Sequence, residues 1–273
     1  MAGLPAGTAF GITVHTVLET VDTTAPDLLG ELTRRCREVL DSRLTRTMDA
    51  VELSTSLLPA METPLGPLAG ELRLRDVAPA DRLAELDFEL PLAGGDTSGD
   101  SAATLGAIAK LLRRRLHRRD PLATYPDRLQ ELDDQRLRGY LVGSLDAVLR
   151  IRDTDGEPTY VVADYKTNWL GGTSGETLSA WHYRPEALAE AMLEAHYPLQ
   201  ALLYCVALHR YLRWRQPGYD ADQHLGGVLY LFVRGMSGAD TPRLDGTPCG
   251  VFGWRPPSGL VEELSRLLAG DGR

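Results

Sequence analysis

The strongest constraint on the fold is a pair of apolar segments joined by a short polar link. Residues 139–151 and 159–165 read GYLVGSLDAVLRI and TYVVADY, and their composition is typical of β-strands. The link between them, RDTDGEP, contains an Asp-Gly pair, which is a hairpin signal between two such segments. The sequence therefore predicts two antiparallel strands, against which the rest of the chain has to pack.

Two carboxylates and a lysine stand in or directly after these apolar segments. Asp146 lies in the first strand, and Asp164 and Lys166 lie two residues apart at the end of the second. Side chains alternate across a strand, so Asp164 and Lys166 share one face, and the hairpin brings Asp146 alongside. Two carboxylates and an ammonium suit metal-assisted phosphodiester hydrolysis, in which the carboxylates hold Mg²⁺ and the lysine orients water or stabilises negative charge. The alternative is a plain surface ion pair at a strand end.

The remaining patterns predict two more strands and several helices. Apolar and acidic residues alternate over residues 84–92, which predicts a half-buried strand, and the apolar run 226–234 predicts a central one. Helices are expected at 11–21, 26–48, 102–119, 185–214 and 256–270. The fourth has a break near Tyr197-Pro198, and the last has a cap from Pro256, Pro257 and Ser258. Residues 50–82 are expected to mix short helical pieces with turns, and 94–101 to form a loop.

This order of elements predicts an α/β fold with a small mixed sheet flanked by helices. We expect one domain over residues 1–273, with a helical insertion at 22–82, a catalytic core at 83–235 and a C-terminal helix at 256–270.

Composition narrows the classes of protein further. A net charge of −9 argues against broad, autonomous nucleic-acid binding, although a site that gathers carboxylates around a metal is itself acidic. The chain has no long apolar run and no N-terminal signal pattern, so we expect a cytoplasmic protein with no membrane partner. Its three cysteines are widely spaced, so we expect them to be free thiols. The basic cluster at 113–119 is interpreted as a solvated helical face rather than a DNA contact.

Lysine is rare in this chain. Among 29 basic residues, only Lys110 and Lys166 are lysines. A lysine that persists in such a background indicates a position that needs a compact ammonium with a tunable pKa. We assign that need to Lys166 and treat Lys110 as a surface residue.

The hairpin segments GSLDAVLRI and YVVADYKTNWLG resemble the nuclease domain at the C-terminus of RecB subunits of RecBCD helicase–nucleases, a branch of the PD-(D/E)xK nucleases. Further blocks match in order. GITVHTVLE resembles the Gly-x3-His helix of that family, PLQALLY its Gln-x3-Tyr motif, and HRYLRWR and GYDADQHLGGVLYLFVRGM its closing segments. The resemblance covers about residues 6–257 and implies a restriction-endonuclease-like core.

The resemblance also implies a metal site. Asp146, Asp164 and His15 would ligate the metal, with the backbone carbonyl of Tyr165 as a further ligand, and Lys166 would serve the attacking water. On its own, a histidine on an amphipathic helix is more often a packed residue than a ligand. Glu19, one turn after His15, could orient it.

Other motif residues would act on the substrate. Gln200 and Tyr204 stand four apart on a helix and would position DNA or the lysine. The family has an acidic residue in the strand before the hairpin, and both Glu85 and Asp87 qualify because they share a face. Trp169 could stack on a base or anchor its loop.

The function implied by the resemblance is that of a Mg²⁺-dependent deoxyribonuclease that cuts single-stranded DNA during double-strand-break repair and recombination. Mn²⁺ is expected to replace Mg²⁺, and Ca²⁺ to bind without much turnover. The implied partners are a RecB helicase portion, RecC- and RecD-type subunits and a RecA-type recombinase. The sequence has no G-x4-G-K-[ST] motif, so ATP-driven unwinding has to come from elsewhere.

Two other interpretations stay open. The first is a catalytically silent module that keeps the fold and only binds DNA or protein, and the presence of every motif residue argues against it. The second is a stand-alone restriction or spacer-processing nuclease of the same superfamily, and the YLFVRGM block favours the RecB type instead.

Overall fold

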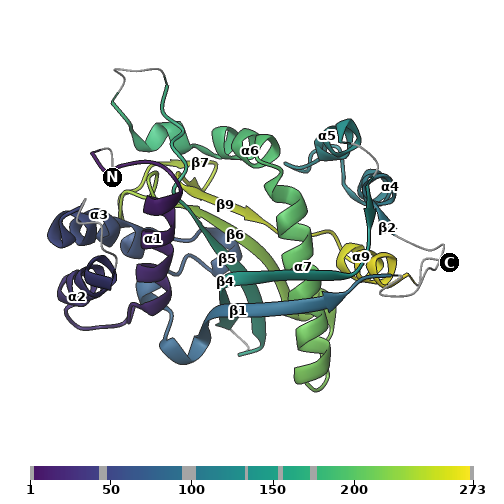
Figure 1. Cartoon of the computed structure of the whole chain (residues 1–273), viewed down its shortest axis with the longest axis horizontal. Coiled ribbons are helices and arrows are strands. Elements are labelled where there is room, and N and C mark those ends of the chain that lie inside the picture. The colour runs from purple at the N-terminus through teal and green to yellow at the C-terminus, as the bar shows by residue number, and fades with distance from the viewer. Residues whose placement is uncertain are drawn as a thin grey trace. The chain divides into compact units, whose positions relative to one another are not determined.

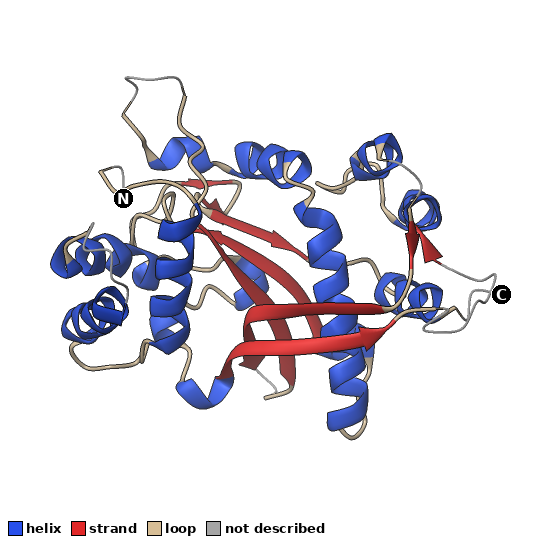
Figure 2. Cartoon of the chain, viewed as in Figure 1, coloured by secondary structure: helices blue, strands red, loops and turns tan. Residues whose placement is uncertain are grey.

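The computed structural model describes residues 3–42, 48–93, 103–132, 135–152, 156–172 and 177–270. Its helices and strands are drawn in Figures 1 and 2. The helices are α1 (Thr8–Thr20), α2 (Leu28–Ser42), α3 (Ala50–Glu62), α4 (Leu105–Arg115), α5 (Tyr125–Glu131), α6 (Pro185–Glu194), α7 (Tyr197–Arg215), α8 (Ala221–His224) and α9 (Leu260–Ala269), with short 3-10 turns at Pro67–Ala69, Leu74–Asp76, Pro79–Asp81 and Ala180–Tyr183. The strands are β1 (Arg82–Pro91), β2 (Ala103–Thr104), β3 (Arg136–Leu137), β4 (Tyr140–Arg152), β5 (Pro158–Lys166), β6 (Leu225–Phe232), β7 (Arg243–Leu244), β8 (Thr247–Pro248) and β9 (Val251–Trp254).

The main sheet has the strand order β1-β4-β5-β6-β9 among the described residues. β4 and β5 pair antiparallel, with Ala147 opposite Ala163 and Arg152 opposite Pro158. The predicted hairpin is therefore confirmed, although part of its Asp-Gly link, residues 153–155, lies outside the described residues. β6 and β9 also pair antiparallel. The sheet is mixed and helices accompany it, so the α/β class predicted from the sequence is confirmed.

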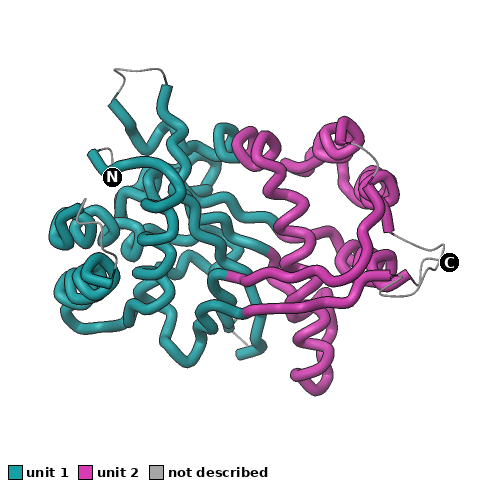
Figure 3. The backbone as a smooth tube through the Cα atoms, in the orientation of Figure 1, with its two compact units in different colours: residues 1–86, 146–188, 228–254 teal, residues 87–145, 189–227, 255–273 magenta. Residues whose placement is uncertain are grey.

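The chain forms two compact units, each assembled from three separate segments (Figure 3). The first unit contains residues 1–86, 146–188 and 228–254, and the second contains residues 87–145, 189–227 and 255–273. The expected insertion at 22–82 corresponds to α2, α3 and three short 3-10 turns of the first unit. The domain boundaries given above stay predictions.

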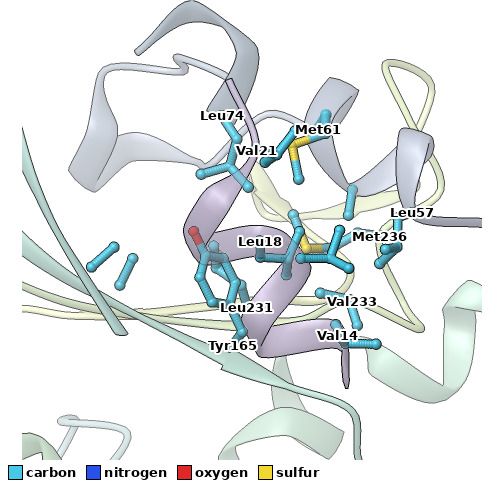
Figure 4. Close-up of a cluster of buried hydrophobic side chains, with 14 of the residues drawn as sticks. Val14, Leu18, Val21, Leu57, Met61, Leu74, Tyr165, Leu231, Val233 and Met236 are labelled. Atoms are coloured by element: carbon cyan, nitrogen blue, oxygen red, sulfur yellow. The ribbon is translucent and has the colours of Figure 1, made fainter. Parts of the chain in front are cut away.

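The core of the first unit is built around one face of α1. Val14, Leu18 and Val21 recur at helical spacing and are almost completely buried. They pack with side chains of α3 and of the ends of β5 and β6, among which Met61 and Leu231 are drawn in Figure 4. Burying a side chain of this size stabilises the fold by about 2 kcal/mol. Packing of this face therefore fixes the position of α1 and of the polar residues on its other side.

The second unit is organised by α7. His196 takes a left-handed backbone conformation, with φ 53°, directly before the helix, and Pro198 occupies its first turn. The predicted break near Tyr197-Pro198 is thus confirmed. Within this unit, the Arg210 guanidinium donates hydrogen bonds to the hydroxyl and the carbonyl of Ser265 at 3.0 and 2.9 Å, which ties α7 to α9.

Several predicted helix boundaries are wrong. α1 begins three residues early, after Gly7, and the 26–48 helix ends at Ser42, with 43–47 outside the described residues. Residues 50–82 contain helical pieces separated by turns, as expected, and the first of these, α3, begins after Asp49, whose carboxylate accepts hydrogen bonds from the N–H groups of its first turn.

Further along the chain, the expected 102–119 helix ends at Arg115, where the backbone becomes extended. The last helix starts at Leu260 after the left-handed Gly259, not with a cap from Pro256–Ser258. β9 and the two-residue strands were not predicted, and the expected loop at 94–101 lies outside the described residues.

The cysteines and the apolarity of the helices can be compared with what was expected from composition. All three cysteines are buried free thiols. Among the described helices, none combines the length and the apolarity that crossing a bilayer requires.

Candidate metal and catalytic site

The β4–β5 hairpin positions the first two carboxylates of the candidate site. Asp146 and Asp164 flank the pair formed by Ala147 and Ala163. One carboxylate oxygen of Asp146, Oδ2, accepts a hydrogen bond from the backbone N–H of Tyr165 at 2.8 Å. The side chain of Asp146 is 14% exposed, so it is held at the strand and still reaches solvent.

Asp164 and Lys166 form a buried ion pair. The Nζ atom of Lys166 lies 2.6 Å from Oδ2 of Asp164, and the two side chains are only 12% and 2% exposed. Burial raises the pKa of Asp164 above its usual range, Lys166 opposes this shift, and the charge of Asp146 adds to it. The prediction that Asp164 and Lys166 share a face is therefore confirmed, and the lysine stands in a largely dry environment, 5.1 Å from the centre of the Tyr230 ring.

α1 brings a histidine and a third carboxylate to Asp146. His15 and Glu19 are four residues apart, so they are neighbours on one face of the helix. His15 Nδ1 lies 3.2 Å from Asp146 Oδ2. One donor atom from each of His15, Glu19 and Asp146 lies within 4.8 Å of the other two. The cluster thus offers an imidazole nitrogen and two carboxylate oxygens at a separation that a single divalent cation can span.

The charges in this cluster act on one another. Burial works against the charged form of His15, but its hydrogen bond with Asp146 and the charges of Asp146 and Asp164 outweigh this and raise its pKa. The pKa of Glu19 is raised by burial and by the neighbouring carboxylates of Glu85 and Asp146. A divalent cation bound here would relieve the repulsion between these carboxylates, so the residues fit a metal ion by their chemistry.

The two acidic candidates of β1, Glu85 and Asp87, fall in different compact units. The charge of Glu85 acts on Glu19, so Glu85 lies on the side of the candidate cluster. Glu85 also has a left-handed backbone, with φ 52°, while the exposure of successive side chains still alternates along the whole of β1. Asp87 belongs to the second compact unit. The sequence pattern could not separate the two, because both lie at exposed positions of a regularly alternating strand, and the choice between them stays a prediction.

An arginine clamps the segment that follows Lys166. Arg234 is 6% exposed, and its Nε donates a hydrogen bond to the Thr167 carbonyl at 2.9 Å. The same guanidinium donates to the carbonyls of Leu4 and Pro5. Its carbon lies 4.7 Å from the centre of the Phe10 ring and 5.6 Å from that of the Trp169 ring. Arg234 therefore joins the start of the chain, α1 and the end of β5 around the candidate site.

Two further contacts fix the same segment. The N–H of Val233 donates a hydrogen bond to the Lys166 carbonyl at 3.0 Å. A side chain at Gly11 would come within 3.2 Å of the Thr167 hydroxyl, so α1 and this segment are in close contact. The strand end that carries Lys166 is thus held from both sides.

The aromatic residues have different surroundings. The Tyr165 ring is buried in the core and packs edge-on against His15, with 6.1 Å between ring centres, so its backbone carbonyl is what remains for metal binding. Trp169 is 41% exposed and contacts Arg234. It therefore anchors its loop and also leaves part of its ring accessible for stacking.

Gln200 and Tyr204 project together from α7, as their spacing predicts. The Gln200 side-chain amide donates a hydrogen bond to the Tyr204 hydroxyl at 2.8 Å, and Tyr204 packs edge-on against Phe88. Both belong to the second unit. Their role in positioning DNA or the lysine stays a prediction.

Sequence reasoning missed the part played by two residues. Glu19 was expected only to orient His15, whereas its carboxylate is close enough to be a ligand, and the i, i+4 spacing was the available signal. Arg234 carried no signal, because an arginine at the end of an apolar strand is indistinguishable from a solvent-facing one.

Comparison with known proteins shows which family this chain resembles. The sequence profile of the PD-(D/E)XK nuclease superfamily matches residues 3–248. The chain is 54% identical to the RecBCD enzyme subunit RecB of Mycolicibacterium smegmatis, over 98% of this chain and 24% of that protein. It is 52% identical to the protein of the same name from Mycobacterium tuberculosis H37Rv, again over 98% and 24%. Identity to the Escherichia coli K12 RecB subunit is 30%, over 97% of this chain and 19% of that protein. The chain thus spans about a quarter or less of these relatives.

Proposed function

This chain belongs to the PD-(D/E)XK nuclease superfamily, and we propose that it is a metal-dependent DNA nuclease. The observation that carries the proposal is the convergence of His15, Glu19 and Asp146 beside the buried pair of Asp164 and Lys166. This arrangement combines a cluster that can bind a cation with a lysine ammonium that is largely shielded from water. These are the two elements that hydrolysis of a phosphodiester needs.

His15, Glu19, Asp146 and Asp164, with the Tyr165 carbonyl, would hold the metal. Mg²⁺ fits a set dominated by oxygen donors, Mn²⁺ tolerates the imidazole as well, and Ca²⁺ binds oxygen ligands with looser geometry. When bound, such an ion neutralises phosphate charge and acidifies a coordinated water.

Lys166 supplies the second element. Asp164 holds its ammonium at 2.6 Å, so the lysine does not have to be ordered when the substrate arrives. From this position the ammonium donates a hydrogen bond to the attacking water or to the negative charge that develops on the phosphate. Glu85, on the side of Glu19, adds negative charge that strengthens cation binding.

We further propose single-stranded DNA as the substrate and a helicase–nuclease as the working assembly. The relatives named above are RecB subunits of RecBCD enzymes, and this chain aligns with a limited part of each. A RecB helicase portion and RecC- and RecD-type subunits would deliver the DNA strand, and a RecA-type recombinase would receive the product in double-strand-break repair and recombination.

The test is cleavage of a labelled single-stranded oligonucleotide in Mg²⁺, Mn²⁺, Ca²⁺ or EDTA. We expect cleavage in Mg²⁺ and Mn²⁺, little in Ca²⁺ and none in EDTA. Lys166→Arg should lose most activity, because a planar guanidinium cannot replace a compact ammonium. Lys110→Arg, at the exposed second lysine, is the matched control and should cut like the unmodified protein.

The alternative of a catalytically silent module makes the opposite prediction. A folded chain that binds DNA and does not cut it in either Mg²⁺ or Mn²⁺ would refute the proposed activity. Full cleavage in EDTA would refute the metal mechanism while leaving a nuclease.

A further inference from the structure

The C-terminal end of α7 carries three arginines around an exposed tryptophan. Trp214 is 77% exposed, the highest fraction among the exposed large hydrophobic side chains of the described residues. Arg210, Arg213 and Trp214 line a shallow hollow of about 280 Å³. The guanidinium carbon of Arg215 lies 5.1 Å from the centre of the indole ring. We call Arg210, Arg213, Trp214 and Arg215 the α7 cluster.

The charge of the α7 cluster is not neutralised locally. Residues 195–219 contain these three arginines and no aspartate or glutamate. Within the part of the chain that the structure describes, no carboxylate oxygen lies within 4.0 Å of a guanidinium nitrogen of Arg213 or Arg215. The basic cluster of α4 behaves differently, because its three arginines pair with Asp127 and Glu263. The α4 cluster is therefore structural, and the α7 cluster keeps its charge available.

Neighbouring groups respond to this positive charge. The pKa of His209 is lowered to about 4 by burial and by the charges of Arg213 and Arg210. Burial and Arg213 also lower the pKa of Arg210. A bound anion would relieve the repulsion among these cations. The helix dipole favours arginines in the last turn, but it gives no reason for an exposed indole between two of them.

We propose that the α7 cluster binds single-stranded DNA, in addition to the candidate catalytic site. The Trp214 indole stacks on an unpaired base, and the guanidiniums of Arg213 and Arg215 contact the flanking phosphates. A single strand fits because a lone exposed ring needs an accessible base face, which a duplex keeps inside its stack. The choice of ligand rests on the proposed function, since it is the substrate class of the nuclease.

The experiment measures binding of a fluorescein-labelled oligothymidylate by anisotropy, in EDTA and at several salt concentrations. Trp214→Ala should weaken binding by roughly tenfold, and Trp214→Phe should restore most of it. The double variant Arg213→Gln/Arg215→Gln should reduce the slope of log K against log salt concentration by about 1.4 in magnitude. Each phosphate contact on a single strand contributes about 0.7 to this slope. The matched control is Arg118→Gln/Arg119→Gln, at two exposed arginines, and should bind like the unmodified protein.

Two further measurements make the result decisive. Stacking should quench tryptophan emission, and Trp214→Phe should remove most of this quenching although Trp169, Trp181 and Trp254 remain. Circular dichroism melting curves check that the variants stay folded, which is expected for a side chain exposed to this extent.

The proposal is overturned if Trp214→Ala and the double arginine variant bind like the unmodified protein, or if the unmodified protein does not bind the oligonucleotide. It is also overturned if Trp214→Ala weakens duplex binding as much as single-strand binding. Cleavage in Mg²⁺ is scored separately. Trp214-dependent binding without cleavage would refute only the proposed activity, and cleavage with Trp214-independent binding would refute only the α7 cluster as a DNA site.

Discussion

Replacing Lys166 by methionine tests how the buried ion pair holds the site together. Methionine keeps most of the length of the side chain and removes the ammonium that lies 2.6 Å from Asp164. Because the Asp164 side chain is 2% exposed, water cannot take over the role of the lost cation. The variant protein therefore has to keep an uncompensated buried carboxylate or protonate it.

The cost follows from burial and depends on pH. Breaking a buried pair by removing one partner destabilises a protein by about 3 to 5 kcal/mol, so we expect Lys166→Met to lose about 3 kcal/mol near pH 8. The lost cation leaves the pKa of Asp164 further above its unfolded value of about 3.9. A carboxyl whose folded pKa is raised destabilises most above that folded pKa, and the penalty disappears as pH falls toward the unfolded pKa. The loss should thus be largest at pH 8 and small near pH 4.

Urea denaturation followed by circular dichroism, in EDTA at pH 5 and pH 8, measures this loss. The double variant Asp164→Asn/Lys166→Met removes both charges and should recover about 2 kcal/mol relative to Lys166→Met alone at pH 8. Lys110→Met is the exposed control and should change stability by less than about 0.5 kcal/mol. If the double variant is no more stable than the single one, or if the loss is the same at both pH values, the buried-pair argument fails.

Two other predictions concern metal binding and acid stability. Glu19→Gln should weaken Mn²⁺ binding about tenfold in calorimetric titration while the exposed control Glu52→Gln leaves it unchanged, and equal affinities would remove Glu19 from the ligand set. The pKa of His209 is lowered to about 4 in the folded protein, whereas the ordinary value is 6.5. As pH falls from 6.5 toward 4, the unfolded chain therefore gains a proton on His209 before the folded protein does, and the free energy of unfolding decreases. This loss is at most about 3 kcal/mol, and His209→Gln should flatten that part of the curve of unfolding free energy against pH; an unchanged curve would contradict it.

Local patterns predicted the elements on which the site is built. The β4–β5 hairpin, the helix of His15 and the break before α7 each depend on residues that are close in sequence, so alternation, spacing and a proline were enough to find them. Asp164 and Lys166 could be assigned to one face because a regular strand has only two.

The remaining features depend on tertiary contacts or lie in segments too short for a pattern. The choice between Glu85 and Asp87 depends on the surroundings of β1, because exposure alternates regularly along the strand and gives both residues the same pattern. β9 has four residues, too few for a clear period. The buried position of Arg234 is set by carbonyls at the start of the chain, and no local pattern encodes them.

The clamp formed by Arg234 has a consequence for the order in which the site is assembled. The guanidinium joins residues separated by 230 positions, and Thr167, which follows Lys166, is one of its acceptors. A contact of such long range closes a long loop, so its formation carries an entropic cost and is slow. On a ribosome, a nascent chain that has already exposed His15, Asp146 and Lys166 would still lack this clamp until residue 234 leaves the exit tunnel. The segment after Lys166 would then be held against α1 only once Arg234 has been added to the chain and has emerged.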